Sequence, residues 1–364
     1  MRILFLQPQP CIRALKYAKG LKNVLKDEIS LIFGYLHRTL TQLYGHGDEL
    51  FDAFIKLNPR NLENDIKSLV RKYRPDIIHS HNAPDFLTVS AVRAVDDVPI
   101  IHDNHDVLSL RRTGYYAHDT KEDILRYKEQ EKIANEESDG RIYATEEIQK
   151  YIQQRYEVDP SKELVFHNYI SESMIPISFN RKISSTNGQI HVVYIGNVSS
   201  GIEGSHYDLK DIFREIAEHG IHIHIYTTYE NMECKRLAEK SKLIHYHGHL
   251  DQRTLLQEIT KYDFGWAGFN TTKNKAHVDA ALPHKVIEYI SCGLPVLAFP
   301  HKTIKRFLER HGVGIVFNSM EELIEKLKDT RELEKIKGNV LKTRRKFTVE
   351  ANINRVLTLY KALT

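Results

Sequence analysis

The sequence of 364 residues lacks several features that would place it in a special class of protein. Its three cysteines are scattered and show no Cys-x-x-Cys spacing, so they favour free thiols in a reducing compartment over a disulfide framework. No run of about 18 apolar residues occurs, so no membrane-spanning helix is expected. The apolar run at residues 3–6 is too short for a signal peptide. We therefore expect a cytoplasmic protein that is at most peripheral on a membrane.

Neither positive nor negative charge dominates the sequence. The chain has 52 basic and 48 acidic residues, a net charge of +4. This excess is too mild to indicate a nucleic-acid partner. It is compatible with a small anionic ligand or with weak contact with an anionic membrane surface. The length suits two α/β domains better than a single core.

Short apolar runs alternate with longer amphipathic stretches, which is typical of a parallel sheet wound with helices. The predicted strands of the first half are 3–6, 29–33, 77–80, 100–102, 141–144 and 164–166. Those of the second half are 191–195, 222–226, 243–246, 262–267, 296–299 and 314–316. The clearest helices are 12–25, 123–135, 209–218, 253–260, 285–292, 320–327 and 349–363. The pattern predicts an α/β protein with two Rossmann-like, doubly wound parallel-sheet domains at 1–170 and 190–345, a linker at 171–189 and a terminal helix within 346–364.

The most informative segment is 282–296, Leu-Pro-His-Lys-Val-Ile-Glu-Tyr-Ile-Ser-Cys-Gly-Leu-Pro-Val. Pro283 suits the first turn of a helix, and Gly293 suits the left-handed residue that ends one. Lys285 and Glu288 share a face near the helix N-terminus, where amides and the macrodipole attract anions. The segment therefore offers a cation for phosphate and a carboxylate for sugar hydroxyls. The alternative is a surface Lys–Glu pair on an ordinary helix.

This segment, L-P-x-K-x-x-E-Y-x-x-x-G-L-P-V, resembles the donor-site motif of the retaining glycosyltransferases of family four. Residues 75–81, 101–106 and 193–196 resemble further segments of that family in the same order. The resemblance implies a GT-B fold, with two domains facing across a cleft and a terminal helix that crosses back to the first domain. It also implies that Lys285 lies near the donor diphosphate and Glu288 on the nucleotide ribose.

Further site residues follow from the resemblance. His105 corresponds to a family histidine near the donor sugar, where it would orient a hydroxyl or relay a proton. Its structural alternative is to hold a loop carbonyl. Asp103 and Asp106 are secondary candidates, with loop capping as the alternative for Asp103. We predict His105 and Lys285 as catalytic residues. The predicted donor-binding residues are Gly196, Asn197, His249, Leu250, Leu282, Pro283, Lys285 and Glu288.

The chain departs from the family pattern in two places. Many relatives carry a second glutamate eight residues before the ribose glutamate, but here that position is Ala280 and the adjacent acid is Asp279. This puts the usual contact with the donor sugar in doubt. The loop after the first strand is usually rich in glycine, whereas here residues 7–11 are Gln-Pro-Gln-Pro-Cys.

Twenty histidines raise the question of a metal site. His222 and His224 alternate, as do His245, His247 and His249, and alternation on a strand places such residues on one face. Because no cysteine spacing supports a zinc site, we interpret them as strand-end histidines and predict no metal.

Two basic segments have both a structural and a functional interpretation. Basic residues on one side of the first helix predict a solvated face, with a strip that touches anionic lipid as the alternative. These residues are Arg13, Lys16, Lys19, Lys22 and Lys26. A loop with Arg111, Arg112 and Tyr115, followed by Tyr116, suits an acceptor, because aromatic faces cover sugars and arginine pairs with phosphate.

The sequence as a whole predicts a cytoplasmic glycosyltransferase of the hexosyltransferase type. It would move a sugar from a nucleotide-diphosphate sugar to a hydroxyl of a glycan or lipid-linked saccharide, with retention and without a cofactor or metal. The alternatives are a sugar-nucleotide epimerase on the same fold and a non-catalytic sugar-nucleotide-binding subunit.

Overall fold

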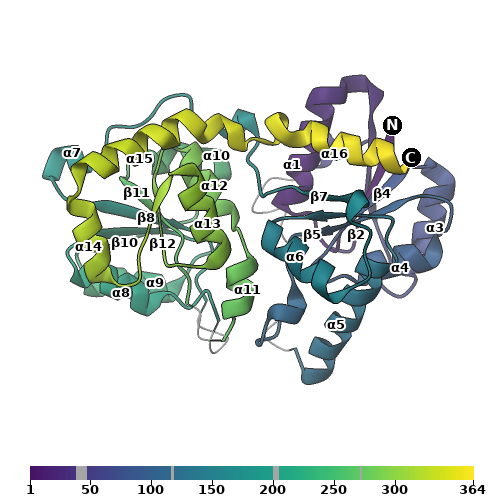
Figure 1. Ribbon diagram of the computed structural model, residues 1–364, viewed down its shortest axis with the longest axis horizontal. Helices are drawn as coiled ribbons and strands as arrows, with labels where there is room; N and C mark the ends of the chain where they lie inside the picture. The colour runs from purple at the N-terminus through teal and green to yellow at the C-terminus, as the bar shows by residue number, and fades with distance from the viewer. Residues whose placement is uncertain (38–46, 116–118, 200–204, 271–272) are drawn as a thin grey trace. The chain divides into compact units, whose positions relative to one another are not determined.

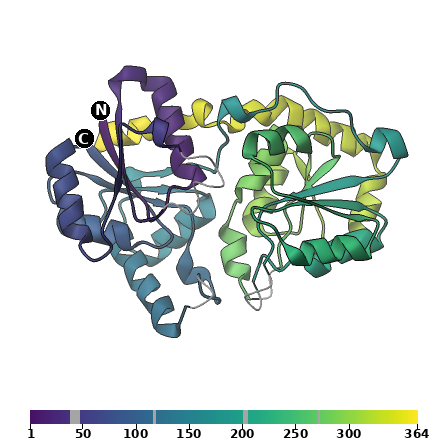
Figure 2. The same cartoon turned by 180° about the vertical axis from the view of Figure 1, so that it is seen from behind.

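The computed structural model describes residues 1–37, 47–115, 119–199, 205–270 and 273–364 (Figure 1). The chain forms two compact units, each built around its own parallel sheet (Figures 1 and 2). The first unit contains residues Met1–Ser171 and Val349–Thr364, and the second contains Glu172–Thr348. This confirms the predicted class of two doubly wound α/β domains.

The first unit has a seven-stranded parallel sheet in the order β3-β2-β1-β4-β5-β6-β7. Its strands are β1 (Arg2–Leu6), β2 (Ser30–Tyr35), β3 (Ala53–Lys56), β4 (Ile77–His81), β5 (Ile100–Asn104), β6 (Gly140–Tyr143) and β7 (Glu163–Val165). Its helices are α1 (Ile12–Leu25), α3 (Leu62–Tyr73), α4 (Phe86–Ala94), α5 (Lys121–Glu136), α6 (Glu146–Arg155) and α16 (Val349–Leu363). The strand order reverses between β1 and β4, where such folds bind ligands beyond the carboxyl ends of the strands.

The second unit has a six-stranded parallel sheet in the order β10-β9-β8-β11-β12-β13. Its strands are β8 (His191–Ile195), β9 (His222–Tyr226), β10 (Ile244–Gly248), β11 (Phe264–Trp266), β12 (Val296–Ala298) and β13 (Gly314–Val316). Its helices are α7 (Ser184–Asn187), α8 (Lys210–Glu218), α9 (Met232–Lys240), α10 (Gln252–Ile259), α11 (Lys275–Ala280), α12 (His284–Ser291), α13 (Lys302–His311), α14 (Met320–Lys328) and α15 (Thr330–Thr343). The order reverses between β8 and β11.

All twelve predicted strands are present, and the sequence pattern missed only β3 among the described strands. This strand has four residues, lies at an edge of its sheet and is only partly buried. Edge strands of this kind carry a weak apolar signal, because water covers part of each side chain. Gly293 has a φ of 76°, as predicted for a residue that ends a helix. Pro283 lies one position earlier than expected, as the residue that precedes α12.

The predicted solvated face of α1 is wrong at two of its five cations. The side chains of Arg13 and Lys16 are only 2% and 8% exposed. Arg13 is drawn into the interior by the carboxylate of Asp103, which lies 3.0 Å from Nε. A pattern that counts every arginine as a surface residue cannot foresee a buried partner 90 residues away.

Residues 172–189, expected as a linker, are grouped with the second unit. The backbone of Ile183 donates to Lys261 O, and Ser184 donates its hydroxyl to Asp263. Helix α16 is grouped with the first unit and packs along α1 (Figures 1 and 2). Gly20 permits this approach, because a Cβ atom there would lie 2.4 Å from Val349 Cγ1.

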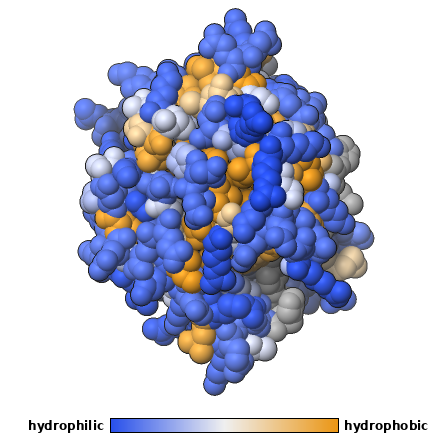
Figure 3. All heavy atoms as spheres, turned by 90° about the vertical axis from the view of Figure 1, so that its right-hand side faces the viewer, coloured by the Kyte–Doolittle hydropathy of each residue, from blue (hydrophilic) through white to orange (hydrophobic). Residues whose placement is uncertain are grey.

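One face of the molecule can be inspected in Figure 3, where polar residues predominate and apolar ones form narrow streaks between them. Within the described ranges, no helix has both the length and the apolar character that a membrane crossing requires.

Candidate functional site

The carboxyl end of β8 and the N-terminus of α12 bring two predicted residues together. Strand β8 ends at Ile195, and Gly196 follows with a φ of 129°, which side chains other than glycine rarely adopt. A Cβ atom on Gly196 would lie 3.2 Å from Lys285 Nζ and 3.5 Å from Cε. Glycine therefore leaves room for the lysine to reach the end of the sheet.

Lys285 is a buried cation without a hydrogen-bond partner among the described residues. Its side chain is 7% exposed, and Nζ makes no hydrogen bond there. The ammonium instead lies 3.9 Å from the ring centroid of Tyr194 and 5.1 Å from that of Phe269. Aromatic faces attract a cation but leave its N–H groups unsatisfied. Burial lowers the pKa of Lys285 to about 7, although the charge of Glu288 opposes this shift.

Glu288 lies one helical turn after Lys285 and is also buried, with 8% of its side chain exposed. Its Oε1 accepts a hydrogen bond of 3.1 Å from Gln252 Nε2 at the start of α10. A carboxylate has about four acceptor positions, so this contact leaves capacity for the two hydroxyls of a ribose. The side chain is thus held in place by Gln252, a residue that the motif did not reveal.

Tyr289 links the two strands that end at this site. Its hydroxyl accepts from Ile195 N at 2.9 Å and donates to Trp266 O at 3.2 Å, so it bridges the ends of β8 and β11. The ring packs against Gly265, where a Cβ atom would lie 2.1 Å from Tyr289 Cγ. Tyr289 belongs to the motif at 282–296, but the sequence alone does not indicate its role. The sequence feature that could have indicated this role is Gly265 in β11, which leaves space for the Tyr289 ring.

The other predicted donor residues differ in exposure. Leu282 is buried at 2% exposure and Pro283 is half-buried, both immediately before α12. Asn197 is exposed, and its carbonyl accepts from the Tyr194 hydroxyl. His249 is exposed and Leu250 half-buried in the loop between β10 and α10. The continuation of the Gly196 loop at residues 200–204 lies outside the described residues.

The departure at Ala280 is not compensated by Asp279. Ala280 ends α11 and is 7% exposed. The carboxylate of Asp279 accepts from Lys302 N at 3.2 Å and pairs with Lys275, so it fixes the start of α13. The adjacent acid therefore has a structural task.

In the first unit, His105 follows β5 and is positioned by Asn82. The His105 backbone N–H donates to Asn82 Oδ1 at 3.2 Å, and Asn82 Nδ2 donates to Asp106 O. The ring nitrogen Nδ1 is buried and lacks a hydrogen-bond partner among the described residues. Burial lowers the pKa of His105, so its imidazole is neutral at pH 7. A neutral imidazole can accept a proton or a hydrogen bond from a hydroxyl.

Asp103 belongs to a buried network and does not cap its loop. Both carboxylate oxygens accept from Arg13 Nε, at 3.0 and 3.1 Å, and His79 Nε2 lies 3.3 Å from Oδ2. His79 Nδ1 in turn lies 2.5 Å from the hydroxyl of Tyr360 in α16. Although burial opposes ionisation, the Arg13 charge and the neighbouring histidines hold the pKa of Asp103 well below its usual range. The network ties the terminal helix to the end of the first sheet.

The predicted acceptor loop is partly held by its own contacts. Arg111 Nη2 donates to Gly114 O at 3.0 Å, and its guanidinium carbon lies 5.4 Å from the ring centroid of Tyr115. Arg112 is exposed. Tyr116 lies outside the described residues. The structure thus groups Gly196, Lys285 and Glu288 in the second unit, whereas His105 and Arg111 belong to the first. The prediction that the two sets face one cleft stays a prediction.

Comparisons with known proteins agree with the predicted resemblance. Residues 46–173 match the model of Glycosyltransferase Family 4, and residues 202–359 match that of the Glucosyltransferase 3-like C-terminal domain. The two matches do not overlap and together cover most of the chain. No curated protein sequence matches it.

Solved structures share the fold over the whole chain. A glycosyltransferase from Rickettsia africae is 14% identical, with a TM-score of 0.69, 100% of this chain covered and 98% of the other. Anabaena Alr3699/HepE in complex with UDP-glucose is 16% identical, with a TM-score of 0.70 and coverage of 98% and 99%. WaaG, a glycosyltransferase involved in lipopolysaccharide biosynthesis, is 12% identical, with a TM-score of 0.66 and coverage of 100% and 99%. At these identities the likeness shows the GT-B fold alone.

Proposed function

We propose that this chain, a glycosyltransferase of the GT-B type, transfers a sugar from a nucleotide-diphosphate sugar to a hydroxyl acceptor with retention of configuration. The observation that carries the proposal is the buried ammonium of Lys285 beside Gly196, at the carboxyl end of β8, which has no hydrogen-bond partner in the part of the chain that the structure describes. An uncompensated buried cation is costly in a folded protein, and a diphosphate supplies the missing charge and acceptors. The complex of Alr3699/HepE with UDP-glucose supports a nucleotide sugar as the donor class.

The leaving diphosphate gains negative charge as its bond to the sugar breaks. Lys285 and the first-turn amides of α12 would stabilise this charge, because fixed dipoles and charges need no reorganisation during the reaction. We propose that this step needs no metal ion, because Lys285 would supply positive charge at the diphosphate. Glu288, held by Gln252, would accept hydrogen bonds from the ribose hydroxyls. His105 would orient a sugar hydroxyl or relay a proton as a neutral imidazole.

The acceptor is proposed to be a glycan or a lipid-linked saccharide that contacts Arg111, Arg112 and Tyr115. Contact with an anionic membrane surface would rest on this loop rather than on α1, because Arg13 and Lys16 are buried. We propose a cytoplasmic location, in keeping with three free cysteines. Exchange of residues in this loop would test directly whether it determines the choice of acceptor.

One observation favours a second candidate, a non-catalytic sugar-nucleotide-binding subunit. Ala280 stands where many relatives have a glutamate, and Asp279 is engaged with α13. The full chain should first be screened by thermal shift against nucleoside diphosphates and nucleotide sugars, because a ligand that binds the native state raises its melting temperature.

The nucleotide sugar that stabilises the chain is then incubated with saccharide and lipid-linked acceptors. Release of nucleoside diphosphate that depends on the acceptor supports the transferase. Binding without turnover supports the subunit, and conversion of the sugar without an acceptor supports an epimerase. No stabilisation by any nucleotide would contradict all three.

A further inference from the structure

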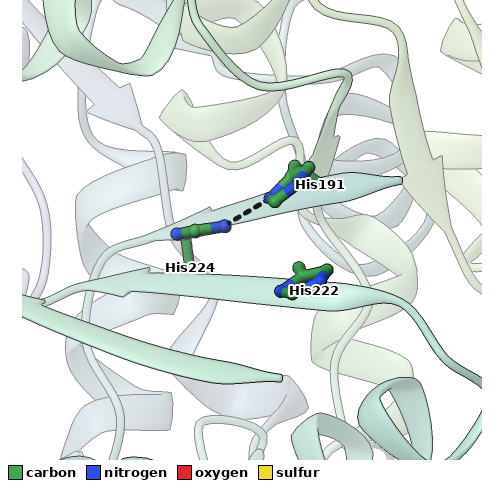
Figure 4. Close-up of side chains that lie close together, drawn as sticks. All are labelled: His191, His222 and His224. Carbon is green, nitrogen blue, oxygen red and sulfur yellow. Dashed lines mark hydrogen bonds between the residues drawn. The ribbon is translucent and has the colours of Figure 1, made fainter. Parts of the chain in front are cut away.

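The second sheet carries a cluster of histidines far along the strands from Lys285. His191 begins β8, whereas His222 and His224 are the first and third residues of β9 (Figure 4). The register pairs His191 with His222, and Val193 with His224, so the three imidazoles lie on one face of two adjacent strands. The candidate donor site lies after Ile195, at the opposite end of β8.

We propose that His191, His222 and His224 bind a divalent transition-metal ion of the zinc class. Each of the three offers a ring nitrogen, and these nitrogens lie within 4.8 Å of one another. His191 Nδ1 and His224 Nε2 face each other at 2.9 Å (Figure 4). Zinc–nitrogen bonds of about 2.0–2.1 Å in a tetrahedral site separate the ligand nitrogens by roughly 3.3 Å. The His222 ring is stacked on His191 with centroids 4.4 Å apart, so an opening of the His191–His224 pair and a turn of the His222 ring would meet the metal's requirement.

Each ring nitrogen of the three histidines has a hydrogen-bond partner, so a bound metal would take the place of part of this network. His222 Nε2 lies 2.7 Å from Gln189 Oε1 and donates its proton there, whereas Nδ1 lies 2.9 Å from His245 Nε2 and accepts from it, so a metal on His222 would replace the His245 contact. His191 Nε2 lies 3.0 Å from Asn187 Nδ2 and 3.3 Å from Asn187 Oδ1, and His224 Nδ1 lies 3.0 Å from His247 Nε2. Each outer nitrogen can thus donate its proton to an acceptor, which is how metal-bound imidazoles are usually oriented. A shift of one proton within the His191–His224 pair, from the inner to an outer nitrogen, exposes both inner lone pairs.

The surroundings favour the neutral form that binds metals. His191 and His224 are 3% and 5% exposed, and such burial disfavours a charged imidazole. Neutral imidazoles suit zinc, copper and nickel, whereas magnesium and calcium prefer oxygen ligands. The carboxylate of Asp263, which accepts from His191 N at 2.8 Å, adds negative charge nearby. The exposed His247 on the edge strand β10 marks the side open to water.

A metal at this place would link β8 to β9 and stabilise the second unit without touching the reacting sugar. Untagged full-length protein is freed of metal with a chelator and titrated by calorimetry with Zn²⁺ and, separately, with Mg²⁺ at pH 7.5. One Zn²⁺ per chain should bind, and Mg²⁺ should not. Saturation with Zn²⁺ at about 100 times its Kd should raise the melting temperature by roughly 5–10 °C. Co²⁺ should give the visible absorption of a low-symmetry site with nitrogen ligands.

Four variants and one control test the assignment. H191Q, H222Q and H224Q should each weaken Zn²⁺ binding by at least about 100-fold, because each removes one of three ligands. Q189A, which removes only the acceptor behind His222, should weaken it by about 10- to 100-fold. H219A removes a partly exposed histidine that directly follows α8 in the same unit and should leave the affinity unchanged.

The proposal is overturned if the untagged protein binds no Zn²⁺, or if H222Q and Q189A keep the wild-type affinity. These two variants carry the test if the deeply buried H191Q or H224Q does not fold, which circular dichroism would show. A purely structural network of imidazoles predicts a loss of stability in the histidine variants with no metal response in any protein.

Discussion

Replacement of Lys285 by methionine should make the protein more stable and at the same time remove its diphosphate site. The lysine is buried and its ammonium has no hydrogen-bond partner within the described chain. The fall of its pKa from 10.5 to about 7 corresponds to about 5 kcal/mol, at about 1.36 kcal/mol per unit. Exchange of buried charges for apolar groups of similar size typically stabilises by about 1–4 kcal/mol, and we expect Lys285→Met to fall in that range.

The dependence on pH follows from the lowered pKa. Between pH 7 and pH 10.5 the unfolded chain holds the Lys285 proton and the folded chain does not. The stability of the wild type therefore rises as the pH rises through this window, and the variant lacks this contribution. Urea unfolding of both proteins at pH 7, 8.5 and 10 should show the advantage of Lys285→Met shrink with each step.

Binding of a nucleoside diphosphate gives the second half of the test. The diphosphate binds the protonated lysine, so wild-type affinity should fall as the pH rises above 7, by up to about tenfold per unit. Lys285→Met should bind at least about tenfold more weakly at pH 7, since it lacks a charge-assisted contact of about 1.5–3 kcal/mol. Calorimetry with the nucleotide found by thermal shift measures both. A variant that is less stable than the wild type and binds the nucleotide equally well would refute this reasoning.

Three further predictions concern the other parts of the chain. Glu288→Ala should weaken donor binding by about ten- to a thousandfold, because it loses two hydrogen bonds to the ribose. The control Gln252→Ala leaves the carboxylate in place and should keep the affinity within about tenfold of the wild type. Equal effects of the two variants in calorimetry would argue against the ribose contact. Sugar transfer should persist in EDTA when measured well below the melting temperature, and full loss that a divalent ion restores would disprove a lysine-assisted departure of the diphosphate. Arg13→Met should lower the free energy of unfolding in urea by about 3–5 kcal/mol, because it leaves the buried carboxylate of Asp103 without its cation. Lys22→Met, at the more exposed pair with Asp52, should lower it by less than about 1 kcal/mol. Similar values for the two variants would show that the burial of Arg13 is unimportant.

The sequence predicted the sheets well because burial leaves a direct mark on it. The bounds of β8 and β9 agree with the predicted ranges residue for residue, since buried parallel strands are short runs of mostly apolar and branched residues between polar loops. The part of the site on α12 was predicted for a similar reason. Lys285 and Glu288 are three residues apart in one helix, so local geometry alone places them on one face.

Contacts between distant segments could not be predicted in this way. Arg13 and Asp103 are 90 residues apart, and Tyr360 lies 281 residues from His79. Nothing in the local pattern of α1 separates Arg13 from Lys22, although the first is buried and the second is partly exposed. The histidines at 191, 222 and 224 look like isolated alternations until the strand register places them on adjacent strands.

Arg13 and Lys285 are both buried cations, but their hydrogen bonding differs, which distinguishes a structural role from a proposed ligand-binding role. All five N–H groups of Arg13 have acceptors, which are Asp103, Tyr17, Asn168 and the carbonyls of Phe166 and His167. Its charge is neutralised and its donors are satisfied, so it has no capacity left for a ligand. Lys285 is buried to a similar degree, but among the described residues its ammonium makes no hydrogen bond and lies against the faces of Tyr194 and Phe269. On the proposed function, the diphosphate of the donor satisfies this cation at the end of β8.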